Sequence, residues 1–187
     1  AARDKKKAVS PASLAPSSAE KNVSGEHRTL TQVKYTLHAE IARGGMGRIY
    51  NGEDKDLERN VAVKISTAGD DSDARFWKEA KVLARLAHPN IVPIHSRGTD
   101  EFGRPFYSMK LVQGRTLQAI IKQLAEGDTA TQREYSDQRL LEIFRKVCDG
   151  VEFAHSKGYL HRDLKPENVM VGEFGEVLVM DWGLAKA

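Results

Sequence analysis

The sequence predicts an α+β protein, with a sheet-rich first half and a second half that is mainly helical. The first half contains short runs of β-branched and aromatic residues separated by glycine or charged turns, a pattern typical of antiparallel strands. The second half contains longer segments whose apolar residues recur at helical spacing. With 187 residues, 40% of them hydrophobic and 29% charged, the chain has the size and composition of one globular domain or of two small lobes.

Residues 1–30 are expected to form a flexible tail ahead of this domain. Serine, alanine, proline and lysine dominate the segment, which has almost no periodic apolar pattern. Such a segment cannot bury enough apolar surface to offset the entropy lost on ordering. We interpret the run Lys5–Lys7 as solvated charge, with a basic docking patch as the alternative.

Charge and cysteine content argue against several classes of protein. The net charge of +3 is small and the basic residues are scattered, so we expect no nucleic-acid partner. No apolar run approaches the roughly 20 residues of a membrane helix, and no apolar stretch follows the N-terminal lysines as in a secretory signal. The single cysteine, Cys148, excludes an internal disulfide and fits a reducing compartment, so we expect the cytoplasm.

Five antiparallel strands are expected in the first half. The runs "YTLHAEI", "RIYNGED" and "NVAVKIS" predict a meander of three strands between residues 35 and 66. The runs "IVPIHSRGT" and "RPFYSMKLV" predict two more strands, which the turn "DEFG" connects.

One helix is expected between the third and fourth strands, in the segment "ARFWKEAKVLARLA". Asp71, Ser72 and Asp73 offer N-caps before it, and Pro89 ends it. Its apolar stripe consists of Phe76, Ala80, Leu83 and Ala87. The first half is therefore predicted to be a five-stranded sheet with one inserted helix.

Two helices and two short strands are expected in the second half. "TLQAIIKQL" predicts a short helix capped by Thr116, and residues 136–158 predict a long one that ends near Gly158. The long helix has an apolar stripe, with further apolar residues beside it: Leu140, Phe144, Val147 and Val151, then Leu141 and Cys148. Because this arc is wide and the strands "NVMVG" and "EVLVMD" are short, we expect a partner or a further C-terminal region to cover the 138–157 helix.

Five motifs carry chemistry, and they occur in a fixed order. They are "IARGGMGRIY", "VAVK", the segment before "GRTL", "HRDLKPEN" and "DWG". Together, over about Tyr35 to Ala187, they resemble the signature set of the Hanks-type serine/threonine protein kinases, in the bacterial style. The resemblance implies a two-lobed kinase fold with a complete N-lobe at 31–112 and a partial C-lobe at 113–187. It also implies transfer of the γ-phosphoryl group of ATP, with Mg²⁺, to serine or threonine hydroxyls of proteins.

The resemblance assigns the nucleotide side to the first three motifs. A glycine-rich hairpin lets backbone N–H groups approach phosphates, and Lys64 is expected to reach the α- and β-phosphates while pairing with Glu79. Met109 takes the place behind the adenine, and Lys110 to Val112 form the hinge. The remaining expected nucleotide-binding residues are Ala42, Gly44, Gly45, Gly47, Ile49 and Ala62, where Ala42 replaces the usual first glycine of the family pattern.

The resemblance assigns the catalytic side to the last two motifs. Asp163 is expected to accept the proton of the substrate hydroxyl, and Lys165 to neutralise the transferring phosphoryl group. Asn168 and Asp181 are the expected Mg²⁺ ligands, and Asn168 is also expected to be one of the residues that bind the cofactor ATP. Trp182 replaces the usual phenylalanine, and its buried indole N–H needs a partner; Gly183 permits the turn that follows. Lys64→Met or Asp181→Asn is expected to abolish transfer and leave the fold intact.

The end of the sequence raises alternatives. Arg162 is typical of kinases whose activation segment is fixed by a phosphate–arginine contact, yet no such segment follows Ala187. We therefore expect a fragment of a longer active kinase, able to recognise Mg-ATP but poor at holding a peptide. One alternative is a non-catalytic ATP-binding or partner-completed regulatory module, and another is a small-molecule phosphotransferase. Ser10, Ser13 and Ser17 are candidate autophosphorylation sites.

Overall fold

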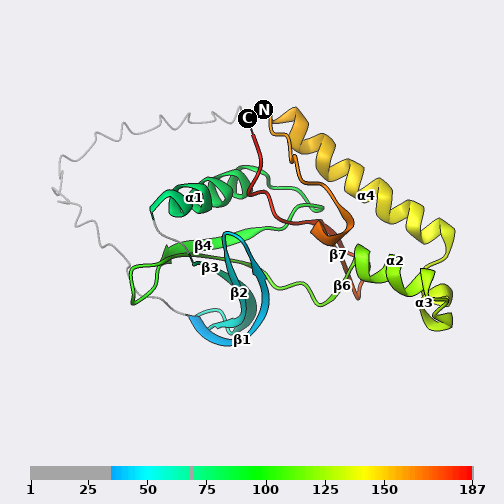
Figure 1. Ribbon diagram of the computed structural model, residues 1–187, viewed down its shortest axis with the longest axis horizontal. Coiled ribbons are helices and arrows are strands. Elements are labelled where there is room, and N and C mark those ends of the chain that lie inside the picture. The colour runs from blue at the N-terminus through cyan, green and yellow to red at the C-terminus, as the bar shows by residue number, and fades with distance from the viewer. Residues whose placement is uncertain (1–34, 68–69, 187) are drawn as a thin grey trace, which may run out of the picture. The chain divides into compact units, whose positions relative to one another are not determined.

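The computed structural model describes residues 35–67 and 70–186 (Figure 1). The expected tail, the Lys5–Lys7 run and the serines Ser10, Ser13 and Ser17 lie outside the described residues. Two antiparallel sheets follow each other along the chain, the first with five strands and the second with three. The α+β class and the kinase-like arrangement predicted from the sequence are confirmed.

The five-stranded sheet has the order β1-β2-β3-β5-β4, and each neighbouring pair is antiparallel. Its strands are β1 (Tyr35–Gly44), β2 (Gly47–Asp54), β3 (Arg59–Ser66), β4 (Ile94–Thr99) and β5 (Pro105–Lys110). The inner strand β3 is buried from Val61 to Ser66, as expected for its run of β-branched residues. The predicted number of strands and the hairpin between β4 and β5 are therefore confirmed.

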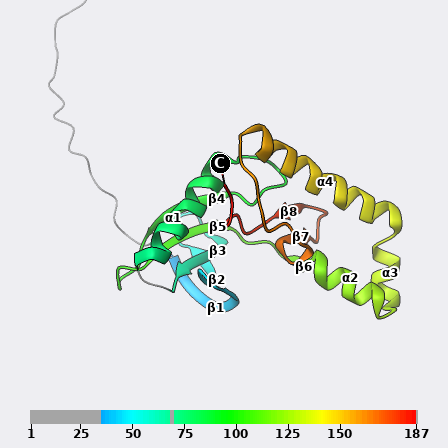
Figure 2. The ribbon, with the colours of Figure 1, turned by 45° about the horizontal axis from the view of Figure 1, so that its top comes forward.

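Helix α1 (Asp70–Arg85) packs against β3, β4 and β5 (Figures 1 and 2). It begins at Asp70, so the predicted caps at 71–73 are wrong in position. Asp73 instead accepts a hydrogen bond at 2.7 Å from the hydroxyl of Ser66, at the end of β3. Three members of the predicted apolar stripe are buried, but Ala87 is exposed because it lies beyond the end of the helix.

The second part of the chain contains β6 (Gly114–Thr116), α2 (Leu117–Ala125), α3 (Thr129–Glu134), α4 (Asp137–Ser156), the 3-10 turn η1 (Pro166–Asn168), β7 (Val169–Gly172) and β8 (Val177–Val179). Thr116 caps α2 as predicted, since its hydroxyl accepts from the Ala119 N–H at 3.1 Å. Gly158, with φ 79°, follows the end of α4. Strand β6 and helix α3 were not predicted from the sequence, because both are very short.

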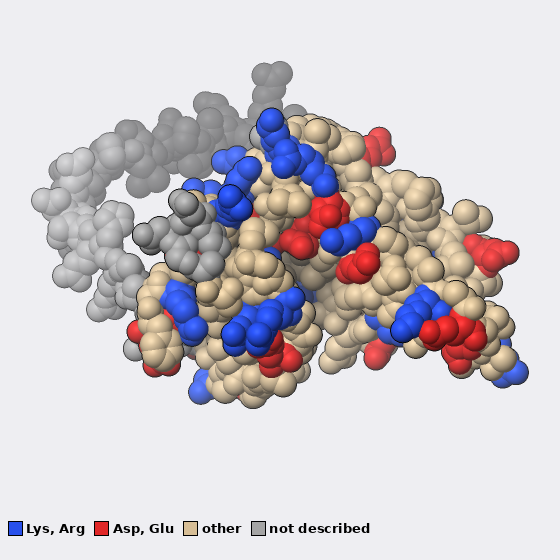
Figure 3. Space-filling view, in the orientation of Figure 1, with Lys and Arg blue, Asp and Glu red and all other residues tan. Residues whose placement is uncertain are grey.

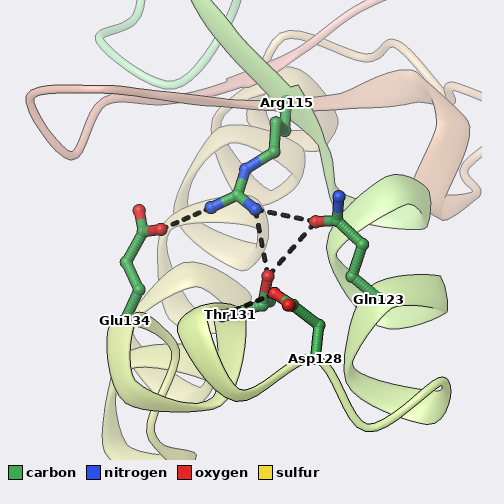
Figure 4. A network of polar contacts seen from close by, with 5 residues as sticks. All are labelled: Arg115, Gln123, Asp128, Thr131 and Glu134. Carbon is green, nitrogen blue, oxygen red and sulfur yellow. Dashed lines mark hydrogen bonds and ion pairs between the residues drawn. The ribbon is translucent and has the colours of Figure 1, made fainter.

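A cluster of polar side chains ties β6 to α2 and α3 (Figure 4). The guanidinium of Arg115 donates to Gln123 at 2.7 Å, to Thr131 at 3.2 Å and to Glu134 at 2.5 Å. Asp128 caps α3 by accepting from the Thr131 N–H at 2.8 Å. These bonds fix the orientation of two short helices that could not hold their place through propensity alone.

Helix α4 buries a face one residue away from the predicted stripe. Its buried residues are Ile143, Val147, Gly150 and Ala154, whereas Phe144 is 66% and Leu141 68% exposed. The cause is packing: α4 lies against β8, and a Cβ at Gly150 would be 3.0 Å from the carbonyl oxygen of Asn90. The predicted stripe is therefore wrong at Phe144, whereas Val147 is buried and Leu140 and Val151 pack partly buried against the core. Phe144, Leu141 and Cys148 are exposed in the described part of the chain.

One apolar core joins the two parts of the described chain. It includes Phe76 from α1, Leu86 just after that helix, Val92 from the connection to β4, Val179 from β8 and Trp182 from the segment after β8. Asn90 reinforces this junction, since its amide donates to the Val177 carbonyl at 3.0 Å and its own carbonyl accepts from the Val179 N–H at 2.9 Å.

The surface drawn in Figure 3 carries mixed charge, with acidic and basic side chains interspersed over the described elements. Among the helices of residues 35–67 and 70–186, none has the length and apolar character needed to cross a membrane.

Candidate active site

The glycine-rich motif forms the hairpin between β1 and β2. Gly44 pairs with Gly47, so Gly45 and Met46 make a two-residue turn. Ala42 lies opposite Ile49, and Ile49 lies opposite Lys64 of β3. The predicted residues of this motif therefore occupy one hairpin, beside the strand that carries Lys64.

Gly47 is required by the close approach of β3. A Cβ added there would be 2.5 Å from the backbone carbonyl oxygen of Ile65, whereas a Cβ at Gly44 or Gly45 would meet nothing within 4 Å. A backbone atom in an inner strand cannot move aside cheaply.

Gly47→Ala is therefore expected to destabilise the fold by about 1–3 kcal/mol, the usual cost of overpacking. Gly44→Ala is the matched control and should change stability by less than about 0.5 kcal/mol, since it adds the same methyl group to open space. Urea unfolding of both variants measures the difference. Equal stability of the two would contradict the described packing of β2 on β3.

The tip of this hairpin reaches the "DWG" segment. The side chain of Met46 lies directly over Gly183, and a Cβ at Gly183 would overlap its terminal methyl group. Gly183 lies in a turn as expected, but its φ is outside the left-handed range. Because these atoms end a flexible methionine side chain that can move aside, the contact does not by itself require a glycine at this position.

Lys64 and Glu79 form a buried ion pair between β3 and α1. The ammonium of Lys64 lies 2.8 Å from each carboxylate oxygen of Glu79. The two residues are 7% and 1% exposed, so water does not screen the pair. The predicted pairing is therefore present in the structure, and it fixes the position of α1 relative to the sheet.

Tyr107 of β5 adjoins this pair and was not identified from the sequence. It lies opposite Lys64 in the strand register, and its hydroxyl donates to Glu79 Oε1 at 2.9 Å. Burial raises the pKa of the Tyr107 phenol well above its ordinary value, and the charge of Glu79 raises it further. Only the register of β3 on β5 could have revealed this neighbour.

The expected adenine side lies on β3, β5 and the segment after β5. Ala62 pairs with Met109, and both are buried. The Lys110 N–H donates to the Pro93 carbonyl at 3.1 Å, and its ammonium lies 3.3 Å from Glu176. Residues 111–113 belong to neither sheet. The backbone N–H and C=O groups of the half-buried Val112 therefore take no part in strand pairing.

The expected catalytic loop, residues 161–168, brings three predicted residues together. Asp163 Oδ2 accepts from the Lys165 ammonium at 3.0 Å and from the Asn168 amide nitrogen at 3.1 Å. The Asn168 nitrogen also donates to the Asp163 carbonyl at 2.8 Å. Among the described residues, the Asn168 side chain makes both of its hydrogen bonds as a donor, through its amide nitrogen. The amide oxygen Oδ1 is therefore oriented away from Asp163.

Asp163 is ionised at neutral pH. The hydrogen bond from Lys165 holds the pKa of the Asp163 carboxyl below its ordinary value, and the Lys165 charge and the Asn168 hydrogen bond act in the same direction. The same bond raises the pKa of Lys165, with smaller contributions from the charges of Glu167 and Asp181.

His161 connects the catalytic loop to the "DWG" segment. The Asp163 N–H donates to its Nδ1 at 3.2 Å, so the ring proton belongs to Nε2, which lies 2.9 Å from the Met180 carbonyl oxygen. The Met180 N–H in turn donates to the Asn168 carbonyl at 2.8 Å. Two predicted ligand positions, Asn168 and Asp181, are therefore held on adjoining backbone.

Trp182 is the apolar anchor predicted for this segment. It is 1% exposed and stacks edge-on against His161 at 4.5 Å between ring centroids. Its indole N–H donates to the Val179 carbonyl at 3.3 Å, so the expected partner is present.

The backbone on both sides of the site is strained. Arg162 and Asp181 have φ of 68° and 54°, a conformation that costs a non-glycine residue roughly 1–3 kcal/mol and is commonest at functional sites. The Arg162 side chain donates to the Leu184 carbonyl at 2.9 Å. Leu160 and Lys186 exchange backbone hydrogen bonds, so the residues after "DWG" lie beside the catalytic loop.

Comparison with known proteins identifies the family. Residues 35–187 match the model of the protein kinase domain. The chain belongs to the protein kinase family. Among similar kinases are the serine/threonine-protein kinases PknD of Protochlamydia amoebophila, 40% identical over 160 residues, and of Chlamydia muridarum, 41% identical over 160 residues.

These relatives are much longer than the present kinase chain. The matched region covers 81% of this chain but 16% of the Protochlamydia kinase and 17% of the Chlamydia muridarum kinase. The chain thus spans about a sixth of the length of the curated kinases it matches.

Protein kinases in general use ATP and Mg²⁺, and the donor set of this kinase chain suits that ion. Mg²⁺ prefers oxygen ligands and is usually held by one or two protein groups together with substrate phosphates. The amide oxygen of Asn168 and the exposed carboxylate of Asp181 provide two such groups. Among the described residues, no group of three or more His, Cys, Asp or Glu is arranged to hold a metal ion.

Proposed function

We propose that this kinase domain transfers the γ-phosphoryl group of ATP, with Mg²⁺, to serine or threonine hydroxyls of proteins. The observation that carries the proposal is the ionised Asp163 carboxylate, hydrogen-bonded to both Lys165 and Asn168. One loop thus contains a proton acceptor in Asp163, a cation in Lys165 and an oxygen ligand for a metal in Asn168.

Asp163 orients the acceptor and receives its proton. Transfer of a phosphoryl group needs a positioned hydroxyl more than a strong base, and an ionised carboxylate at hydrogen-bond distance is sufficient. As the hydroxyl oxygen bonds to phosphorus, its proton passes to a carboxylate oxygen of Asp163, and the bond between the γ-phosphorus and its bridging oxygen to the β-phosphate breaks.

Lys165 is suited to neutralise the group in transit. Its ammonium is half exposed and bound to Asp163 alone among the ion pairs of the described residues, so a small rotation can bring it onto the phosphoryl oxygens. A cation placed where negative charge develops lowers the barrier without a proton transfer of its own.

Lys64 and the hairpin hold the rest of the nucleotide. In protein kinases the β3 lysine binds the α- and β-phosphates while its glutamate partner keeps it in place, and Lys64 with Glu79 has the matching positions and contacts. Asn168 and Asp181 would hold Mg²⁺, which would supply positive charge that neutralises the phosphates of ATP. Ala62, Met109 and residues 110–112 would enclose the adenine.

The choice of serine or threonine over tyrosine rests on Lys165, two residues after Asp163, and on the similarity to the PknD relatives, which are serine/threonine-protein kinases. The cytoplasm, where ATP is available and a thiol such as the exposed Cys148 stays reduced, is the proposed compartment.

Transfer to a mixed pool of serine-, threonine- and tyrosine-containing peptides tests the proposal. With γ-labelled ATP and Mg²⁺, we expect label on serine and threonine and none on tyrosine. Label found only on added small molecules would favour a metabolite phosphotransferase, and tight nucleotide binding without any transfer would favour a regulatory ATP-binding module. Either result would overturn the proposed reaction.

A further inference from the structure

A buried phenol beside the Lys64–Glu79 pair has no role in the reaction described above. We propose that the Tyr107 hydroxyl is a positioning group that holds the Glu79 carboxylate when the Lys64 ammonium turns towards the phosphates of ATP. The inference rests on the proposed function and deepens it. It states that the Tyr107 hydroxyl allows Lys64 to bind the phosphates of ATP and Glu79 at the same time.

The hydrogen bonds to Glu79 are shared unequally between its two oxygens. Oε2 accepts from Lys64 at 2.8 Å, whereas Oε1 accepts from both Lys64 at 2.8 Å and Tyr107 at 2.9 Å. Oε1 is therefore the oxygen that keeps a donor if Lys64 withdraws one of its N–H groups.

The donor count of lysine makes this duplication useful. An ammonium has three N–H groups, and Lys64 gives two of them to Glu79. Contact with two phosphates needs two N–H groups, so one bond to Glu79 must be released. Glu79 is 1% exposed, and a buried carboxylate oxygen that loses its donor carries a large desolvation cost. The bond from Tyr107 to Oε1 removes this cost.

Tyr107 is well placed to act on both the sheet and the helix. It lies opposite Lys64 on the neighbouring strand, and its ring packs on Phe76 of α1 at 5.1 Å between centroids. Its side chain is 1% exposed, so water does not compete for the hydroxyl. Burial and the charge of Glu79 keep the pKa of the phenol high, so the hydroxyl retains its proton as a donor.

Tyr107→Phe tests the proposal, because it removes the hydroxyl and keeps the ring. The readout is the affinity for a non-hydrolysable ATP analogue in the presence of Mg²⁺, measured by titration calorimetry. We expect affinity to fall about fivefold to tenfold, the equivalent of one buried hydrogen bond. In the Glu79→Gln background the same change should alter affinity less than twofold, because the carboxylate on which Tyr107 acts is absent.

Tyr35→Phe is the matched control. The Tyr35 hydroxyl bonds to Ser108 at 2.9 Å, next to Tyr107 on β5 but on the opposite face, since adjacent strand residues alternate. This variant should lower the melting temperature and leave analogue affinity within twofold of the wild type.

Three outcomes would overturn the role of Tyr107: unchanged affinity in Tyr107→Phe, an equal loss in Tyr35→Phe, or an undiminished effect in the Glu79→Gln background. A wild-type chain that binds the analogue but transfers no phosphoryl group from ATP would instead overturn the proposed function and leave the Tyr107 result interpretable.

Discussion

Replacement of Asp163 by asparagine is expected to lower kcat for phosphoryl transfer by about 10²–10⁴-fold, the usual contribution of a positioned proton acceptor. The amide keeps the size of the carboxylate but cannot take the hydroxyl proton. Affinity for ATP should stay within about twofold, since the nucleotide contacts proposed here come from other residues.

Stability should change little in Asp163→Asn. The ion pair with Lys165 is partly exposed, 31% at Asp163 and 47% at Lys165, and such pairs contribute at most about 1 kcal/mol. Asp149→Asn is the matched control, because it breaks a similarly exposed pair with Arg145 on α4. An Asp163→Asn variant that retains wild-type kcat in single-turnover assays would remove Asp163 from the mechanism.

Lys64→Met is expected to weaken ATP binding about 10–100-fold, the equivalent of one charged hydrogen bond. It should also destabilise the fold by about 3–5 kcal/mol, because it leaves the Glu79 carboxylate buried without its cation. The second effect revises the sequence-based expectation that this variant leaves the fold intact. Calorimetric titration and urea unfolding measure the two effects separately.

The double variant Lys64→Met/Glu79→Gln separates charge burial from nucleotide binding. It should recover much of the lost stability, since no unpaired charge remains, while ATP affinity stays low. Lys78→Met, which removes an exposed lysine next to Glu79 in the sequence, is the control and should change neither quantity. If Lys64→Met were as stable as the wild type, the buried ion pair described here would be wrong.

The fold class and most elements could be predicted because local pattern determines them. The β-rich runs became strands, Thr116 capped α2, and Gly158 followed the end of α4. Details set by tertiary packing could not be predicted. The buried face of α4 is chosen by the close approach of Gly150 to Asn90, which no periodicity in the helix itself reveals.

Contacts within the candidate site also fall into those that could be predicted from the sequence and those that could not. The residues of "HRDLKPEN" lie near one another in the chain, so their mutual contacts follow from the motif. The contacts that cross elements needed the structure, because they depend on strand register and on hairpin position. Tyr107 opposite Lys64, Met46 over Gly183 and Lys110 beside Glu176 are all of this kind.

The most direct test of the central claim is the intact mass of the purified chain before and after incubation with Mg-ATP, with Asp163→Asn measured in parallel. We predict that the wild type gains mass in steps of one phosphoryl group and that the variant gains it about 10²–10⁴-fold more slowly. No gain in the wild type, or an equal gain in both proteins, would contradict the account.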